Sequence, residues 1–388
     1  MDDSPHKILV VDDEPDLERL VRQRMRHEIR AGTYSLAFAR DGVEALDVLA
    51  KSEPFDLVIS DINMPRMDGL ELLERIPVTP DIRAVVVSAY GDIRNIRIAM
   101  NRGAFDFITK PVDFTDLRLT IERTLRNLGE WRDTVASREE LAKLENELEV
   151  ARRMQRSILP TNFPSGPCYK LHANMRTARA VGGDFYDFVV LEGGRVGFAV
   201  ADVSGKGVPA ALFMMSTRTL LKGAAIGTRD PGEALANVND LLAADNSAMM
   251  FVTMLYMIFD PSKGTLTYAC GGHEAPVLVR PDGCATELPR TGGIALGVIS
   301  ESKYECHTAT LSPGDTIVLY TDGVTEARNE AGGQFGIERL CTAFGNKPPA
   351  DPEAATTSVF DAVCEFVGDA PQFDDITCVA LQYTEGSA

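Results

Sequence analysis

Between residues 7 and 125, short apolar runs alternate with longer stretches of helical periodicity, and this alternation constrains the fold more than any other feature. The runs KILVVDD, SLAFA, FDLVISD, AVVVSA and FDFITK are apolar almost throughout, and stretches such as DLERLVRQRM and GVEALDVLA separate them. Apolar strands separated by helices are typical of a parallel sheet that is covered on both faces. The pattern predicts a doubly wound, five-stranded α/β domain, with its site at the carboxyl ends of the strands.

Charged and polar side chains follow several of these runs. Asp12 and Asp13 close the first run and Asp61 closes FDLVISD, so we expect three carboxylates at one sheet edge. Like charges gathered there repel one another unless a cation is present, and oxygen ligands suit Mg²⁺. Lys110 and Ser88 bring an ammonium group and a hydroxyl to the same edge. A single strand-end aspartate is commonly a helix cap, but the whole set predicts a carboxylate that accepts a phosphoryl group.

A second region, residues 112–159, is poor in glycine and proline and predicts a long helix that is interrupted by Gly129 and ended by Pro160. Its second half carries side chains at alternating spacings of three and four, namely Leu141, Leu144, Leu148, Ala151, Gln155 and Ile158. Such a helix can be a solvated linker. The spacing favours a paired helix or coiled coil, and therefore a homodimer.

After Pro160 the chain changes to short β-runs with glycine-rich turns, such as GRVGFAVADVSG, DTIVLYTDG and DITCVALQY. Between these runs lie helical stretches near residues 208–226, 231–244, 335–345 and 351–367. Hairpin-like strands with intervening helices predict a mixed α/β sandwich rather than a second doubly wound unit.

Four aspartates in this last region are expected to end β-runs beside glycine or another small turn residue, namely Asp184, Asp202, Asp322 and Asp374. One Asp-Gly pair is commonly a hairpin turn, and the glycines of GKGVPAAL can start a helix or allow a close approach of the backbone. Four carboxylates together form a cage for two hard cations such as Mg²⁺ or Mn²⁺. A pair of such cations activates water for attack on phosphorus, so the set predicts phosphate-ester hydrolysis.

Composition excludes several classes of function. The net charge of −18 argues against a nucleic-acid binder, and no apolar run approaches the roughly 18 residues that span a membrane. The seven cysteines contain no CxxC pair and the five histidines no ligand pair, which predicts reduced thiols and no zinc site. The start of the chain, MDDSPHK, lacks the features of a signal peptide, and we expect a cytoplasmic protein.

The motifs VVDDEPD, SDINMPRMDG, VVSAYGD and ITKPVD, in this order within residues 5–125, resemble those of response-regulator receiver domains, which have a flavodoxin-like fold. The resemblance implies that a histidine kinase is a partner and that Asp61 is the phospho-acceptor. It also implies that Mg²⁺ is bound by Asp12, Asp13, Asp61 and the carbonyl of Asn63. The remaining roles that it implies are a switch hydroxyl, an aromatic switch and a phosphate-binding lysine, namely Ser88, Phe107 and Lys110.

The segments ARRMQRSILP, ARAVGGDFYDF, ADVSGKGVPAAL, CGGHEAPVLV, LYTDGVTEARN and FDDITCVAL resemble PPM metal-dependent protein phosphatases of the SpoIIE and RsbU branch. The resemblance implies that Asp202 and the carbonyl of Val203 bridge two Mn²⁺ or Mg²⁺ ions. It implies that three further aspartates complete the metal shell, namely Asp184, Asp322 and Asp374. Asp375 is the less favoured ligand.

Three residues near these motifs have less definite roles. Glu274 stands where relatives more often carry asparagine. His273 is expected to be structural. Arg179 lies just before VGGD, where it can contact the substrate phosphate or have a surface role.

The order of a receiver domain (5–125), a helical linker (126–159) and a phosphatase domain (160–385) implies a response regulator whose output is a phosphoserine or phosphothreonine protein phosphatase. By resemblance, its substrate is a phosphorylated anti-sigma-factor antagonist of the STAS type in a partner-switching pathway. Phosphorylation of Asp61 is expected to act through the helix. The alternative is a phosphorylation-controlled adaptor that uses the phosphatase fold as a binding surface, against which the four aspartates argue.

Overall fold

The computed structural model describes residues 4–76, 81–89, 91–244, 246–345 and 348–385. The chain forms two compact units, Met1–Lys143 and Leu144–Ala388. The division falls within one helix, α6 (Phe114–Ile158), so that each unit contains a part of this helix.

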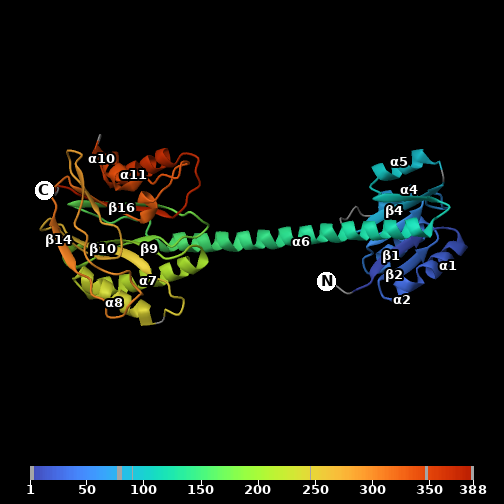
Figure 1. Ribbon diagram of the computed structural model, residues 1–388, viewed down its shortest axis with the longest axis horizontal. Coiled ribbons are helices and arrows are strands. Elements are labelled where there is room, and N and C mark those ends of the chain that lie inside the picture. Colours follow the sequence, from blue (N-terminus) through green and yellow to red (C-terminus); the bar gives the residue numbers. More distant parts are fainter. Residues whose placement is uncertain (1–3, 77–80, 90, 245, 346–347, 386–388) are drawn as a thin grey trace. The chain divides into compact units, whose positions relative to one another are not determined.

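The first unit contains a parallel sheet with the strand order β2-β1-β3-β4-β5. Its strands are β1 (His6–Val11), β2 (Tyr34–Ala39), β3 (Leu57–Asp61), β4 (Arg83–Ala89) and β5 (Asp106–Lys110). The connecting helices are α1 (Pro15–Arg24), α2 (Arg26–Arg30), α3 (Gly42–Lys51), α4 (Gly69–Arg75) and α5 (Ile93–Asn101), as Figure 1 shows in blue and cyan. The central strands are buried on both faces, as Leu9 and Val58 illustrate. The predicted doubly wound fold is confirmed.

Helix α6 runs without a break through Gly129, so the predicted interruption at this residue is wrong. A glycine costs a helix only about 1 kcal/mol relative to alanine. Contacts on both sides of Gly129 hold the helix in place. Leu128 is buried, and Arg132 pairs with Asp56 at 2.7 Å. Within the described residues, no helix combines the length and the apolar character that crossing a bilayer requires.

The second unit contains two antiparallel sheets that pack face to face. One has the order β14-β11-β10-β9-β8 and the other β13-β12-β15-β16-β7-β6. The strands of the first sheet are β8 (Phe185–Val190), β9 (Val196–Val203), β10 (Val252–Asp260), β11 (Thr265–Gly271) and β14 (Cys306–Thr310). Those of the second are β6 (Ser165–Gly166), β7 (Tyr169–Arg176), β12 (Val277–Val279), β13 (Ala285–Glu287), β15 (Thr316–Tyr320) and β16 (Ile376–Tyr383).

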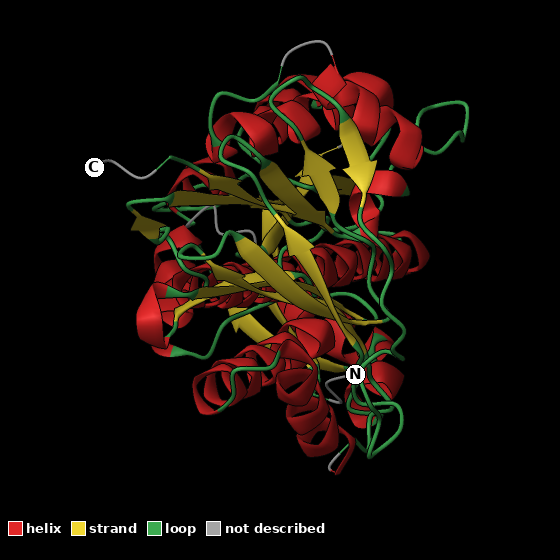
Figure 2. Ribbon diagram, turned by 90° about the vertical axis from the view of Figure 1, so that its left-hand side faces the viewer, coloured by secondary structure: helices red, strands yellow, loops and turns green. Residues whose placement is uncertain are grey.

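Helices cover the outer face of each sheet. Helices α7 (Val208–Gly227) and α8 (Pro231–Ala244) lie on the first sheet, and α10 (Gly336–Gly345) and α11 (Pro352–Val367) lie on the second (Figure 1). The short elements η1 (Glu192–Gly194) and α9 (Asp322–Thr325) lie in loops. Figure 2 shows the strands in yellow between layers of red helices. The predicted α/β sandwich is confirmed.

The main core of this unit lies between the two sheets. Phe198 and Val200 of β9 belong to the same buried cluster as Leu319 of β15 and Val379 of β16. Because apolar side chains from both sheets interdigitate there, the ends of β8, β9, β15 and β16 are held at fixed separations. Those strand ends carry the acidic residues of the second candidate site.

Candidate functional sites

The first acidic pocket lies at the carboxyl edge of the parallel sheet in unit 1. Carboxylate oxygens of Asp12, Asp13 and Asp61 lie within 4.8 Å of one another. Asp12 and Asp61 are buried, whereas Asp13 is exposed. Their donors are all oxygens, so the trio matches the preference of Mg²⁺, as the sequence predicts. Gly69 lies so close to the Asp61 carbonyl that any side chain there would clash with it.

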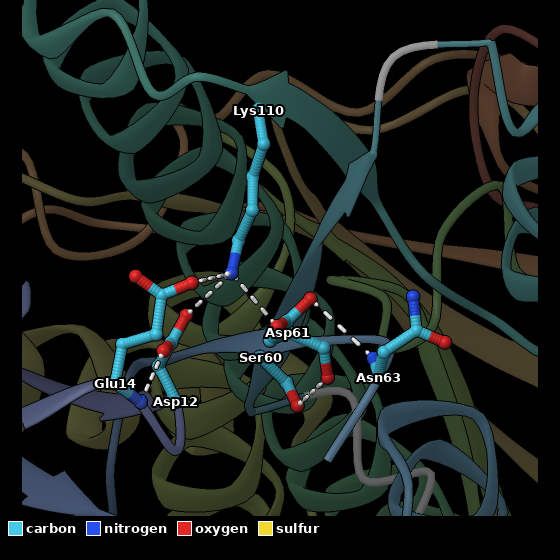
Figure 3. Close-up of polar contacts among 6 residues, drawn as sticks. All are labelled: Asp12, Glu14, Ser60, Asp61, Asn63 and Lys110. Atoms are coloured by element: carbon cyan, nitrogen blue, oxygen red, sulfur yellow. Dashed lines mark hydrogen bonds and ion pairs between the residues drawn. The ribbon is translucent and has the colours of Figure 1, made fainter.

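Lys110 supplies the positive charge of this pocket. Its Nζ lies 2.8 Å from Asp61, 3.1 Å from Asp12 and 3.3 Å from Glu14 (Figure 3). Burial opposes the charge of Lys110, but hydrogen bonds and Coulomb attraction from Asp61 and Asp12 outweigh it and raise the pKa of the lysine. Burial also raises the pKa of Asp12, against the hydrogen bond from the Glu14 amide and the charge of Lys110.

The remaining predicted receiver residues lie around this pocket. The Asn63 amide donates to Asp61 over 3.4 Å (Figure 3). Ser88 is fully buried near the end of β4, and its hydroxyl has no hydrogen-bond partner among the described residues. Phe107 lies on the neighbouring strand β5 and is 41% exposed. The switch functions of Ser88 and Phe107 remain predictions.

The second acidic site lies in unit 2 and takes aspartates from both sheets. Asp184 directly precedes β8, Asp202 lies in β9, Asp322 begins α9, and Asp374 lies two residues before β16. The expectation that each aspartate ends a β-run is therefore wrong for Asp184 and Asp374, which stand before their strands. The hairpin-turn alternative for Asp322 is also wrong, because a helix starts there. Pairing of β8 with β9 and of β15 with β16 brings the strand ends together in each sheet.

Asp184 is the most deeply buried of these four carboxylates. Its Oδ2 accepts hydrogen bonds from the hydroxyls of Thr321 at 2.8 Å and Thr377 at 2.6 Å. Burial, followed by repulsion from Asp202 and Asp375, raises the pKa of Asp184 well above its usual range despite these hydrogen bonds.

The same physical cause acts on the neighbouring carboxylates. Burial and then repulsion from Asp322 raise the pKa of Asp202 to about 7. Burial and then repulsion from Asp374 raise the pKa of Asp322 to about 6. Lys206 provides a compensating charge at one side, where its ammonium lies 2.9 Å from the Asp374 carboxylate. Oxygen donors whose ionised forms destabilise one another fit hard divalent cations.

The glycines of VGGDFYDF leave room for backbone groups at the site. A Cβ atom on Gly183 would lie 2.7 Å from the carbonyl oxygen of Val203, the carbonyl that the resemblance assigns to the metals. A side chain on Gly182 would clash with the Asp375 carboxylate. Asp375 accepts hydrogen bonds from the amides of Ala178 at 2.7 Å and Gly183 at 2.8 Å. Its oxygens are thus engaged by backbone amides, in keeping with its ranking as the less favoured ligand.

The residues of uncertain role have different environments. His273 is buried, with one ring nitrogen 2.8 Å from the Thr253 hydroxyl and the other 3.0 Å from the Tyr320 carbonyl. Burial lowers the pKa of His273 to about 4, so the ring is neutral near pH 7, which supports a structural role. Glu274 pairs with Arg290 at 2.7 Å. Arg179 is exposed.

Sequence reasoning missed several residues that hold the acidic site in place, namely Gln155, Lys206, Thr321 and Thr377. Thr321 and Thr377 stand beside predicted motif aspartates, and two threonines flanking acidic positions are a weak sequence signal. The spacing of apolar residues places Gln155 in the helical seam. The structure shows instead that it is 3% exposed and bonds to Gly182 within the same unit.

Family models match two parts of the chain. The model for the response regulator receiver domain matches residues 8–122, and the model for stage II sporulation protein E (SpoIIE) matches residues 192–384. The chain is 33% identical over 243 residues to phosphoserine phosphatase RsbU of Bacillus subtilis. The matched region covers 62% of this chain and 71% of RsbU. The chain belongs to the SpoIIE phosphatase family. This SpoIIE-family protein additionally carries a receiver domain.

Two further relatives of this SpoIIE-family protein agree with the assignment. It is 31% identical over 268 residues to Protein IcfG of Synechocystis, covering 61% of this chain but only 41% of that protein. The structure of the SiaA-PP2C domain of Pseudomonas aeruginosa superposes with a TM-score of 0.55 at 26% identity. It covers 63% of this chain and 98% of that domain. The resemblances predicted from the motifs are confirmed, and membership of the family implies divalent metal ions.

Proposed function

We propose that this protein is a two-component response regulator whose output is a metal-dependent phosphoserine or phosphothreonine protein phosphatase. The observation that carries the proposal is the cluster of Asp184, Asp202, Asp322 and Asp374, where burial and mutual repulsion raise the pKa of three members. Four retained carboxylates of this kind favour catalysis over an adaptor that uses the fold for binding alone.

Different residues of the chain have different roles at this site. Asp202 and the Val203 carbonyl would hold two Mn²⁺ or Mg²⁺ ions together with the other three aspartates. When bound, such a pair of cations supplies Lewis acidity that activates water and neutralises phosphate oxygens. Thr321 and Thr377 fix the orientation of Asp184 through their hydroxyls. Lys206 neutralises Asp374 and places a positive charge at the side of the site.

The test is Mn²⁺-dependent turnover of a phosphoserine protein by the full chain. Asp202→Ala should abolish turnover while leaving the fold intact by circular dichroism. Exposed Asp282 provides a matched control, because Asp282→Ala removes a carboxylate of the same type outside the acidic site. A parent protein that binds the phosphoprotein but never releases phosphate would favour the adaptor.

We propose further that a histidine kinase phosphorylates Asp61 and that Mg²⁺ is held by Asp12, Asp13, Asp61 and the Asn63 carbonyl. Lys110 already lies at hydrogen-bonding distance from Asp61, where it can neutralise a phosphoryl group. Phosphatase rates should be compared with and without an acyl-phosphate mimic on Asp61. A change in either direction supports control by the receiver, and equal rates contradict it.

The proposed substrate is a phosphorylated anti-sigma-factor antagonist of the STAS type, in a partner-switching pathway. The family assignment and the similarity to RsbU support this choice. Incubation with phosphorylated STAS proteins of the same genome, followed by phosphate release, tests it. A phosphatase that acts on other phosphoserine proteins but on none of these would contradict the substrate and retain the activity.

A homodimer through α6 is also proposed. Leu141, Leu144 and Leu148 are 57%, 51% and 38% exposed and follow the spacing of a paired helix. Sedimentation of the full chain should give twice the monomer mass, and replacement of all three leucines by glutamate should give the monomer. A parent protein that sediments as a monomer at micromolar concentration would contradict the pairing.

A further inference from the structure

A cavity of about 150 Å³ lies directly beside the acidic site of the second unit. Its walls include Asp374 and also Gly323, the residue after Asp322. Part of the wall is apolar, with the buried side chains of Val363 and Ile376. A volume of about 150 Å³ holds one benzene-sized group, whereas pockets for free small-molecule ligands measure roughly 300 Å³ or more. The cavity therefore fits one side chain of a larger partner.

Two arginines lie at the mouth of this cavity. Arg176 and Arg328 both line it, and both are exposed. Arg176 is the last residue of β7, where its backbone pairs with Ile376 of β16. Arg328 follows α9, which begins with Asp322, and pairs with Gln334 in an isolated β-bridge. Backbone pairing thus holds both arginines close to the elements that carry the aspartates.

Both guanidinium groups are available to an anionic ligand. Arg176 donates to the Cys364 sulfur at 3.2 Å, and its guanidinium carbon lies 5.6 Å from the centre of the Phe360 ring. The guanidinium carbon of Arg328 lies 5.1 Å from the centre of the Phe373 ring. Among the described residues, the contacts of these two guanidinium groups include no ion pair with a carboxylate. Their charges are therefore not neutralised within the chain.

The other charged groups around the cavity leave an excess of positive charge. Asp374 pairs with Lys206 at 2.9 Å, and this lysine also lies 4.2 Å from the centre of the Phe373 ring. Glu326 lines the cavity too, and burial followed by repulsion from Asp374 and Glu326 raises the pKa of Asp322. Apart from the Lys206–Asp374 pair, two arginines thus face one carboxylate. This local excess, in a chain of net charge −18, favours an acidic group of the partner.

We propose that this cavity is a substrate subsite that takes an acidic residue near the phosphoserine of the protein substrate. The methylene groups of a glutamate would contact the apolar wall, and its carboxylate would accept hydrogen bonds from Arg176 and Arg328. The planar guanidinium group of arginine matches the geometry of a carboxylate. Because the cavity adjoins Asp374, the phosphoserine can occupy the acidic site at the same time. This inference rests on the proposed function, since it states which phosphoproteins the same site selects.

The test measures turnover by the full chain with Mn²⁺. The substrate is a phosphoserine protein in three forms, with glutamate, alanine or lysine at one position within three residues of the phosphoserine, and each position is varied in turn. At the favoured position we expect kcat/KM to be about tenfold higher for glutamate than for alanine, the size of two exposed ion pairs together. Lysine should be the poorest. The difference should lie in KM, because a contact away from the phosphorus stabilises the ground state and the transition state alike.

Charge reversal provides the decisive variant. Arg176→Glu combined with Arg328→Glu should reverse the order, so that the lysine form becomes the best substrate. Arg229→Glu is the matched control, because exposed Arg229 pairs with Glu192 at 3.4 Å and does not line the cavity. It should retain the preference of the parent. If the double glutamate variant does not fold, Arg176→Gln with Arg328→Gln should remove the preference for glutamate.

The outcomes separate the two proposals. A parent protein that turns over all forms with equal kcat/KM at every position would overturn the subsite and leave the phosphatase activity standing. Arginine variants that slow all three forms by the same factor would also overturn it, since the arginines would then contact the phosphate common to all forms. A parent without turnover of any form would instead overturn the proposed function. A preference for glutamate that charge reversal inverts and Arg229→Glu retains supports the inference.

Discussion

The two acidic sites of this chain contain similar residues, but the repulsion among their carboxylates is offset in different ways. In the receiver pocket, Lys110 contacts Asp12, Asp61 and Glu14, so a built-in ammonium offsets the carboxylates. In the phosphatase site, Lys206 pairs with Asp374, whereas among the described residues the Asp184 carboxylate accepts hydrogen bonds from two hydroxyls and has no ion pair. Hydroxyl hydrogen bonds stabilise a carboxylate less than a neighbouring cation does. The pKa of Asp184 is accordingly raised far above its usual range.

This difference corresponds to two kinds of chemistry. A pocket with its own cation can accept a phosphoryl group on one carboxylate without losing its charge balance. A buried cluster without enough internal cations binds protons or divalent metal ions instead. We therefore expect mutations at the two sites to affect stability with opposite signs.

The largest expected effect is that of Asp184→Asn. Turnover should fall at least about a thousandfold, the size seen when a key transition-state contact is removed. The metal-free protein should become more stable by about 1–2 kcal/mol, because an amide relieves the repulsion from Asp202 and still accepts from the two threonines. Activity assays and calorimetry of the EDTA-treated protein measure the two effects. An inactive variant that is also less stable would contradict the expectation that the carboxylates of the phosphatase site destabilise the metal-free fold.

The second prediction concerns pH. The pKa values of Asp202 and Asp322 rise from 3.8 to about 7 and about 6 in the folded protein. The folded state thus binds more protons than the unfolded chain between these values. The raised pKa values of Asp202 and Asp322 therefore contribute stability to the metal-free phosphatase at low pH, and this contribution is lost as pH rises from about 4 to 7. Since metal ions must displace those protons, Mn²⁺ affinity should rise about tenfold or more between pH 5.5 and 8.

Calorimetry of the phosphatase transition with and without Mn²⁺ at several pH values checks this prediction. The receiver provides the internal control, because the raised pKa of Lys110 keeps its ammonium charged throughout this range. Trp131 is the single tryptophan of the chain and lies in the first unit, so its fluorescence follows receiver unfolding separately. If the stability of both units depended on pH to the same extent, the proposed difference between the two acidic sites would be contradicted.

The third prediction removes the cation of the receiver. Lys110→Met leaves the buried carboxylates of Asp12 and Asp61 without their partner. We expect a loss of about 1–3 kcal/mol in receiver stability at pH 7, allowing for the partial exposure of the lysine. Urea unfolding followed by Trp131 fluorescence measures it. Lys110→Arg should retain most of the stability, and Lys143→Met, at an exposed position on α6, should have little effect.

The sequence predicted the fold classes, because these depend on local patterns of apolar runs and turns. It did not predict on which side of a strand each aspartate lies, since Asp184 and Asp374 precede β8 and β16 rather than end a run. The predicted interruption of the helix at Gly129 is wrong, because tertiary contacts of Leu128 and Arg132 compensate for the low helix propensity of glycine. The partners of Asp184 could not be predicted, since Thr321 and Thr377 lie more than 130 residues away from it along the chain. The same holds for Gln155, whose position on the helix resembles that of a seam residue.

The last prediction examines the hydroxyls that replace a cation around Asp184. Thr377→Val keeps the shape of a fully buried side chain and removes one of the two hydrogen bonds to Oδ2. We expect Mn²⁺ affinity to fall about tenfold, as for other groups that orient a metal ligand. Thr217→Val is the matched control, because the buried Thr217 hydroxyl donates to the Phe213 carbonyl of its own helix, away from the acidic site. If both variants bind Mn²⁺ equally well, Asp184 is fixed by backbone alone. A loss confined to Thr377→Val shows that the hydroxyls of the phosphatase site orient Asp184, whereas the receiver pocket relies on the charge of Lys110.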